Sequence, residues 1–253
     1  MAPAQDYGDL PIVQYWHDPE IPSDVAELIA TFRDRNPDMR HMVFSEAEAE
    51  EFIADRHTPR ELAAFRACAV PAMQADYFRY CAAFTLGGIW ADADLLCVGA
   101  LRGLVEATDS ALLFRRKPRD NLVNSFFVFV APGHPLLRLA IDLASANIER
   151  RMSKAVNMVT GPWVFTDLLT LHALGSVEAV QSAAAAAGRV RHAARLLEAV
   201  GDFARLAQAF DGVQIEPIEI AGTWIDSPAT PPRYKQSDTY WPNWHRRGGT
   251  IYR

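Results

Sequence analysis

The sequence predicts an α/β protein with a mainly parallel central sheet flanked by helices. Short apolar segments of strand type alternate along the chain with longer segments of helical periodicity. The 253 residues are 50% hydrophobic and 22% charged, which leaves ample material for one large core. We therefore expect a single domain over residues 1–253.

The first strand and helix are bounded by turn residues. LPIVQYW, at residues 10–16, is typical of a buried strand. A helix is expected from about Ser23. It should end before the RNPD sequence at residues 35–38, because the residue before a proline avoids the helical conformation. A second short strand, HMVFS, is expected at residues 41–45.

Two capping boxes indicate where the next helices begin. Ser45 is followed by Glu48, and Thr58 is followed by Glu61, so each pair has the spacing at which two side chains satisfy the first backbone groups of a helix. Pro59 stands at the first helical position, where its missing N–H is not needed. We expect helices to start after Ser45 and after Thr58.

The centre of the chain combines a long helix with three strands. PAMQADYFRYCAAFTL, at residues 71–86, is strongly helical, and Gly87 supplies its C-terminal stop. Strands are expected at three segments: IWADADLLCV (89–98), SALLFRRK (110–117) and NSFFVFVAP (124–132).

The remainder is mostly helical. Helices are expected at residues 134–151 and 161–175, followed by an alanine-rich helical region at 176–210 that is broken near Gly188 and Gly201. This region either borders an acceptor cleft or serves packing alone. Residues 213–253 are expected to form a closing strand, VQIEPIEI, and a tail rich in Pro, Trp, Tyr and Arg.

Charge and cysteine content exclude some classes of function. A net charge of -6 argues against a nucleic-acid partner, which needs a basic face. The 3 cysteines have no CxxC spacing, so a zinc site is not expected. No signal peptide is visible and no stretch approaches the ~20 apolar residues of a transmembrane segment. We expect a cytoplasmic protein, either free or peripheral to the inner membrane.

Asp92 and Asp94 interrupt an otherwise apolar segment. In an extended strand, residues two apart point the same way, so both carboxylates should face one site. Burying two like charges without a partner is costly, and a divalent cation resolves this. Mn²⁺ and Mg²⁺ prefer such oxygen ligands and share them with substrate phosphates. The alternative is a solvated loop, against which the apolar flanks argue.

Asp76 and Arg79 lie on one face of the preceding helix, at i and i+3. An ordinary ion pair within the helix is one interpretation. If the helix packs against the strand that carries Asp92, however, both side chains line the same cleft.

The combined pattern resembles a known family. ADYFRYCAAFTLGGIWADADLL, residues 75–96, is similar to the signature of the family 32 glycosyltransferases, whose sugar-binding region contains a DXD motif and which include yeast mannosyltransferases and bacterial capsule-sugar transferases. Weaker resemblance, through PIVQYW, MVFSEAEAEEFI, NSFFVFVAPGHPLL and TGPWVFTDLL, extends over a core at residues 10–170.

The resemblance implies a GT-A-like fold and transfer of a hexose, with retention, from a UDP- or GDP-sugar with the help of Mn²⁺ or Mg²⁺. In that picture Asp94 binds the metal, and Asp92 contacts the ribose or reaches the metal through water. Asp76 and Arg79 hold hydroxyl groups of the donor sugar. A metal and cationic groups would stabilise the charge that develops on the leaving diphosphate.

Three further site residues follow from the same resemblance. Trp16 is expected near the base and Asn124 is expected to face the donor. The tail NWHRRGGTIY resembles the closing region of the family, which makes His245 a candidate metal or phosphate ligand and Arg246 a candidate phosphate contact. The alternative for the tail is a solvated basic segment.

Two other functions remain open. A metal-dependent phosphatase or nucleotide-sugar hydrolase also uses paired aspartates, but Leu96 stands where the phosphatase pattern has Thr. A non-catalytic nucleotide-sugar-binding module would bind without turnover. For a transferase, the acceptor could be a glycan, a lipid-linked sugar or a protein, and the sequence does not choose among them.

Overall fold

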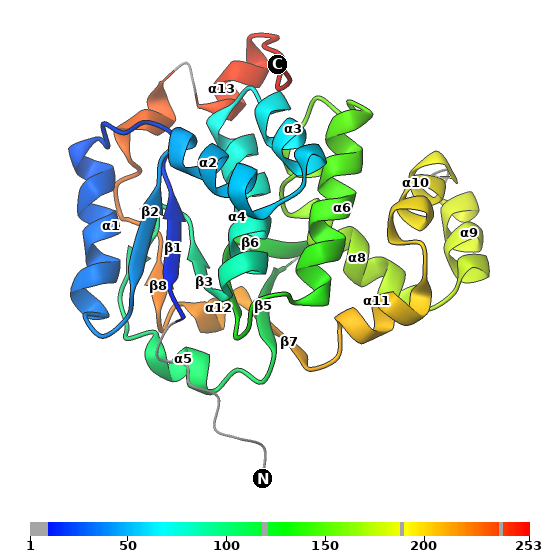
Figure 1. The fold of residues 1–253 in the computed structure, drawn as a ribbon, viewed down its shortest axis with the longest axis horizontal. Coiled ribbons are helices and arrows are strands. Elements are labelled where there is room, and N and C mark those ends of the chain that lie inside the picture. The colour runs from blue at the N-terminus through cyan, green and yellow to red at the C-terminus, as the bar shows by residue number, and fades with distance from the viewer. Residues whose placement is uncertain (1–9, 118–120, 188–189, 238–239) are drawn as a thin grey trace.

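A computed structural model describes residues 10–117, 121–187, 190–237 and 240–253. A six-stranded sheet of order β2-β1-β3-β6-β5-β7 forms the centre, with helices on both of its faces (Figure 1). Its strands are β1 (Ile12–Tyr15), β2 (His41–Phe44), β3 (Gly88–Ala91), β5 (Ala111–Arg116), β6 (Asn121–Phe129) and β7 (Val213–Pro217). Every strand except β6 runs in the same direction, so the predicted α/β class with a mainly parallel sheet is confirmed.

Both faces of the sheet are buried, because alternate side chains of each strand enter two different apolar clusters. Val13, Phe127 and Phe129 belong to one cluster, whereas Ile12 and Phe126 belong to the other. The first cluster contains residues of α2 (Glu46–Arg56), α3 (Pro59–Ala67), α4 (Pro71–Leu86) and α6 (Pro135–Glu149). The second contains residues of α1 (Ser23–Arg35), α5 (Arg102–Glu106) and α12 (Ile218–Ala221).

The predicted starts and stops of the early helices are confirmed. Both capping boxes form, with the Ser45 and Thr58 hydroxyls accepting from the backbone N–H groups of Glu48 and Glu61. Helix α4 ends at Gly87, whose φ of 65° is a conformation that side-chain-bearing residues rarely adopt.

The strand expected at residues 89–98 is wrong in its middle. β3 ends at Ala91, and the chain then turns, with the Leu95 N–H donating to the Asp92 carbonyl at 3.1 Å. Asp92 makes the last backbone bond toward β6, and beyond it aspartate favours a turn. The chain resumes as β4 (Leu96–Cys97), which pairs with β8 (Ile225–Asp226) in a separate two-stranded sheet.

The closing strand is also shorter than expected. β7 ends at Pro217, which has no N–H to continue a ladder, and the residues that follow form the one-turn helix α12.

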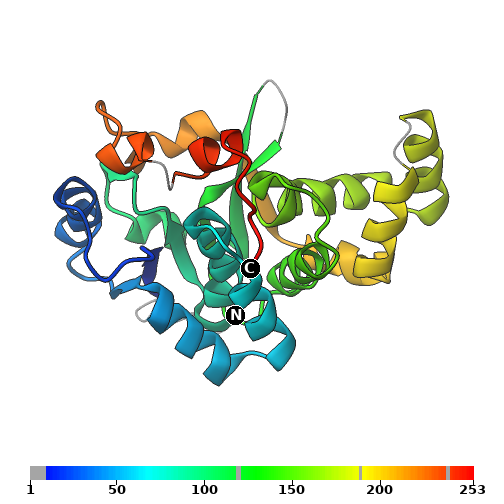
Figure 2. The ribbon, with the colours of Figure 1, turned by 90° about the horizontal axis from the view of Figure 1, so that it is seen from above.

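Helices in the second half follow the predicted segments. α7 (Val156–Val159) and α8 (Trp163–Leu174) lead into α9 (Val177–Ala186), α10 (Val190–Val200) and α11 (Phe203–Ala209). Figures 1 and 2 both show α9 and α10 projecting from one side of the molecule. Gly201, with a φ of 71°, forms the expected break, whereas Gly188 lies outside the described residues. The division of the chain into core, helical elaboration and tail stays a prediction.

The last part of the chain returns to the carboxyl ends of the parallel strands. We call residues 233–246 the C-terminal segment; it contains the 3₁₀ helix η2 (Arg233–Gln236) and helix α13 (Trp241–Arg246). In Figure 1, α13 lies beyond the end of the sheet at which β1 finishes. None of the helices in the described part of the chain has the length and apolar character needed to cross a membrane.

Candidate active site

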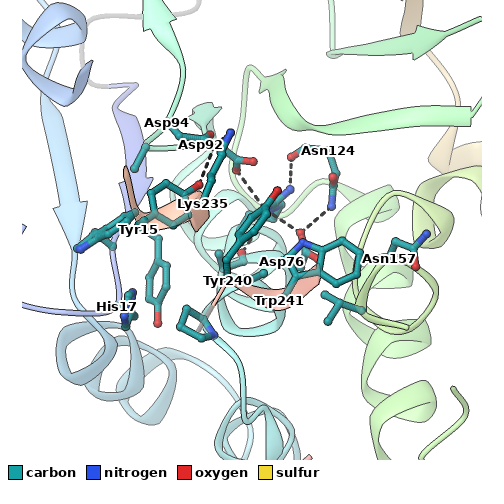
Figure 3. Close-up of a pocket in the computed structure, with 18 of the residues that line it drawn as sticks. Tyr15, His17, Asp76, Asp92, Asp94, Asn124, Asn157, Lys235, Tyr240 and Trp241 are labelled. Carbon is teal, nitrogen blue, oxygen red and sulfur yellow. Dashed lines mark hydrogen bonds and ion pairs between the residues drawn. The ribbon is translucent and has the colours of Figure 1, made fainter. Parts of the chain in front are cut away.

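A cavity of about 350 Å³ opens beyond the carboxyl ends of β1 and β3, where ligands bind in open α/β sheets. Its size is within the range of small-molecule sites. Figure 3 shows the side chains around it, which come from β1 and the residues after it, from α4, from the turn after β3, from β6, from α7 and from the C-terminal segment.

Asp76 and Arg79 form a buried ion pair on α4, with 2.8 Å between Oδ1 and Nη2. Asn124 of β6 completes the cluster: its side-chain amide donates to Asp76 Oδ1 at 3.0 Å and its carbonyl accepts from Arg79 Nη1. Burial raises the pKa of Asp76, while Arg79 and Asn124 act to lower it. The ion pair within the helix that the sequence offers therefore forms, but both of its side chains are buried rather than on the surface.

Arg79 also reaches Asp92, in the turn after β3, with 3.1 Å between Nη2 and Oδ1. The indole N–H of Trp90 donates to the same carboxylate oxygen at 2.9 Å. Burial, together with the nearby Asp94, raises the pKa of Asp92 to about 7, against the lowering effect of Arg79. For Arg79, burial alone would lower the pKa, but Asp92 and Asp76 together raise it.

Asp94 faces the cavity and contacts the C-terminal segment. Its Oδ2 atom accepts a hydrogen bond from the Tyr234 hydroxyl at 2.8 Å and lies 2.6 Å from the Lys235 ammonium. Although the strand expected here is a turn, both aspartates of the motif line the same cavity, as the sequence predicts.

Trp16 forms the wall on the β1 side. Its ring packs edge-on against Tyr234, with 5.0 Å between ring centroids, and only 9% of the residue is exposed. Its indole N–H is buried and has no hydrogen-bond partner among the described residues. A buried donor without a partner beside a cavity is suited to an acceptor brought by a ligand.

The structure brings together the predicted site residues of the core but not those of the tail. Trp16, Asp76, Arg79, Asp92, Asp94 and Asn124 all line the cavity. His245 and Arg246 are exposed on α13 and are not among the lining residues. The Arg246 guanidinium donates instead to the Asn243 side chain and to the Pro242 carbonyl. The roles predicted for all eight residues stay predictions.

Several lining residues were not singled out from the sequence. The C-terminal segment contributes Tyr234, Lys235, Tyr240 and Trp241, and α7 contributes Asn157. The one available signal was the density of aromatic residues in the tail, a composition more common at binding surfaces than on ordinary solvated ones.

The two aspartates suit a divalent ion of the Mg²⁺ or Mn²⁺ type. Such ions need only one or two protein carboxylates when substrate phosphates and water supply the other ligands. No group of three or more His, Cys, Asp or Glu side chains in the described part of the chain could hold a metal unaided. Asp94 already faces a cation, since the Lys235 ammonium occupies its Oδ2 atom. The donor set therefore fits a metal that arrives together with a phosphate ligand.

Comparisons with known proteins identify relatives of part of this chain. Residues 22–111 match the family described as "Glycosyltransferase sugar-binding region containing DXD motif". The chain is 27% identical over 174 residues to the Initiation-specific alpha-1,6-mannosyltransferase of Candida albicans, covering 54% of this chain and 45% of the relative. It thus spans less than half the length of that curated relative.

Among solved structures, PaToxG Glycosyltransferase aligns with a TM-score of 0.49 and 17% identity, over 81% of this chain and 84% of the other. The residues that match the family model, 22–111, contain both α4 and the aspartates of the cavity. That family model describes glycosyltransferases. The resemblance noted from the sequence is confirmed for this part of the chain: residues 22–111 are similar to the DXD-containing sugar-binding region of glycosyltransferases.

Proposed function

We propose that the protein transfers a hexose from a UDP- or GDP-sugar to an acceptor hydroxyl, with retention of configuration and with the help of Mn²⁺ or Mg²⁺. One observation carries the proposal: the Asp76–Arg79–Asp92 cluster, in which Asp76 and Arg79 are buried, lines a single cavity together with Asp94, the other aspartate of the DXD motif. Buried charges that are kept beside a cavity are candidates for functional groups.

The cavity offers a separate place for each part of the donor. Trp16 and Tyr234 present aromatic surface and an unpartnered N–H, which suit a base. Asp94 would hold the metal, and Asp92 would contact the ribose or reach the metal through water. When bound, the metal would supply positive charge to the diphosphate. Asp76 and Asn124 offer oxygen and amide groups for sugar hydroxyls at the buried end.

The transfer itself needs little covalent chemistry from the protein. The bond between the sugar carbon and the diphosphate oxygen breaks, and a bond to the acceptor oxygen forms on the same face of the sugar. The acceptor proton passes to the leaving diphosphate. The carboxylates that line the cavity in the described residues, Asp76, Asp92 and Asp94, are each paired with a cation. This pairing favours the front-face route over attack by an enzyme nucleophile.

Donor and acceptor are proposed only by class. The alpha-1,6-mannosyltransferase relative makes mannose the first hexose to test. The acceptor is a glycan, a lipid-linked sugar or a protein, with capsular polysaccharide as one glycan of this kind. A cytoplasmic location, free or peripheral to the inner membrane, belongs to the same proposal.

Incubation of the purified protein with UDP- and GDP-sugars and Mn²⁺ tests the function directly. A transferase or its slow hydrolytic side reaction releases an intact nucleoside diphosphate. A phosphatase or nucleotide-sugar hydrolase cleaves phosphate bonds and gives inorganic phosphate or a nucleoside monophosphate. Binding of the donor with no turnover, across a panel of simple glycan acceptors, would identify a binding module and contradict the proposal.

A further inference from the structure

Lys235 lines the cavity and brings a positive charge from the C-terminal segment to the DXD motif. Among the described residues of that segment, no other cation lines the cavity. Its ammonium lies 2.6 Å from Asp94 Oδ2, and 31% of its side chain is exposed. Figure 3 shows the lysine side chain running to Asp94 at the cavity wall. The contact joins two segments that are far apart in the chain.

The position of the lysine is fixed by its surroundings. Tyr234, the preceding residue, donates to the same Asp94 oxygen at 2.8 Å and packs against Trp16. The Asn243 side chain donates to the Ser237 carbonyl at 2.7 Å, which ties η2 to α13. The backbone N–H of Arg233 donates to Asp24 at 2.7 Å and anchors the start of η2 to α1. The segment therefore presents Lys235 at Asp94.

The same oxygen cannot bind an ammonium group at this distance and a divalent ion at once, because the two cations would repel each other at close range. Under the proposed function, a metal on either oxygen of Asp94 would lie close to the Lys235 ammonium, and repulsion between the two cations favours displacement of the lysine. The displaced ammonium would still be held beside the cavity by η2. Without Asp94 it would lack a negatively charged partner. The diphosphate of the donor is the anion that enters with the metal.

We propose that Lys235 exchanges partners during donor binding: it occupies Asp94 in the donor-free protein and neutralises the donor diphosphate once a divalent ion has taken Asp94. The proposal rests on the proposed function of the site. It makes Lys235 a ligand-contacting residue, and it makes metal and diphosphate binding mutually dependent through one side chain.

The proposal gives effects of opposite sign on two ligands, which a purely structural lysine would not produce. In Lys235→Gln, the affinity of the free protein for Mn²⁺ should rise about fivefold, because the competing cation is gone. The affinity for UDP or GDP in saturating Mn²⁺ should fall about tenfold, because a charged phosphate contact is lost. Both are binding measurements, made by electron paramagnetic resonance of Mn²⁺ and by calorimetry.

Two variants separate charge from structure. Arg233→Gln removes an exposed ion pair with Asp24 on the same turn, outside the cavity, but keeps the backbone bond that anchors η2, so both affinities should be unchanged. Lys235→Arg keeps the positive charge and should keep Mn²⁺ affinity near that of the wild type. If Arg233→Gln reproduces the effects of Lys235→Gln, or if the two affinities change in the same direction, the exchange is wrong.

Failure of this proposal differs from failure of the proposed function. If the wild type binds Mn²⁺ and nucleoside diphosphate and Lys235→Gln does so equally well, only the exchange is overturned. If neither protein binds the metal or the nucleotide, the function proposed for the site is overturned and the exchange with it.

Discussion

Arg79 on α4 and Asp92 in the turn after β3 are joined by an ion pair of 3.1 Å across the floor of the cavity. The pair links α4 to the DXD motif. Arg79 at the same time binds Asp76 at 2.8 Å. One buried guanidinium therefore holds two carboxylates that would otherwise repel each other. The sequence signature at residues 75–96 thus places Asp76, Arg79 and Asp92 where one cation neutralises two carboxylates.

Removal of Arg79 should strongly destabilise the protein. Arg79→Met leaves Asp76 and Asp92 without their shared cation, and breaking a buried pair costs about 3–5 kcal/mol. Urea unfolding followed by circular dichroism measures the loss. Arg33→Met, which removes an exposed pair with Asp34, is the matched control and should change the unfolding free energy by less than about 0.5 kcal/mol. Equal losses in the two variants would contradict the role given to the buried pair.

Under the proposed function, Asp94→Asn should lower donor turnover by about 100-fold or more, since it would remove a metal ligand whose charge is needed when the diphosphate leaves. The rate of UDP or GDP release in saturating Mn²⁺ is the measurement. Asp211→Asn, at an exposed position away from the cavity, is the control and should turn over donor at the wild-type rate. A fully active Asp94→Asn would remove the basis for a metal at this position.

Gly161 should not tolerate a side chain. A Cβ atom there would lie 2.6 Å from the Asn157 Cα and 3.1 Å from Asp76 Oδ2, so Gly161→Ala must shift the loop against the cavity. We expect donor affinity to fall about tenfold and stability to fall by about 1–3 kcal/mol. Gly103→Ala has no atom within 4 Å of the new Cβ and should leave calorimetric donor binding unchanged. Wild-type binding by Gly161→Ala would show that the loop does not shape the site.

His134 should make stability depend on pH. Burial lowers its pKa to about 4, and its ring accepts the Leu136 N–H at the start of α6 at 3.2 Å. Between pH 6.5 and 4 the unfolded chain binds a proton that the folded protein excludes, so stability falls as the pH falls through this range. The loss from this group is about 2–3 kcal/mol.

The variant His134→Asn isolates that contribution. Asparagine caps helices well and does not titrate, so the variant should lose about 2–3 kcal/mol less than the wild type between pH 6.5 and 4. Urea unfolding at a series of pH values gives both curves. Parallel curves for the two proteins would mean that His134 does not titrate as burial predicts.

Local signals predicted the elements well where they were strong. The boundaries of α4 follow from Pro71 and Gly87, and the two capping boxes fixed the starts of α2 and α3. The end of β3 was not predictable in this way, because it depends on where the ladder with β6 stops. An apolar segment that contains two aspartates has the same composition whether it continues as a strand or turns.

The site was predictable in its core and not in its C-terminal wall. Asp76, Arg79, Asp92 and Asp94 lie within one short signature, so their proximity follows from one helix and one strand that pack together. Tyr234 meets Asp94 across 140 positions of sequence, and no local pattern encodes such a contact. The resemblance drew attention to His245, whereas the earlier half of the segment supplies the cavity wall.

Strand β6 runs opposite to the other strands of the sheet, and this direction decides which of its residues lie at the cavity. Because β6 runs against its neighbours, it brings its beginning, which includes Asn124, to the cavity. The end of β5 at Arg116 and the start of β6 at Asn121 consequently lie at the cavity end of the sheet. Because the strand ladder behind them keeps the donor-holding groups in register, the side chains at these two strand ends can be changed without moving those groups.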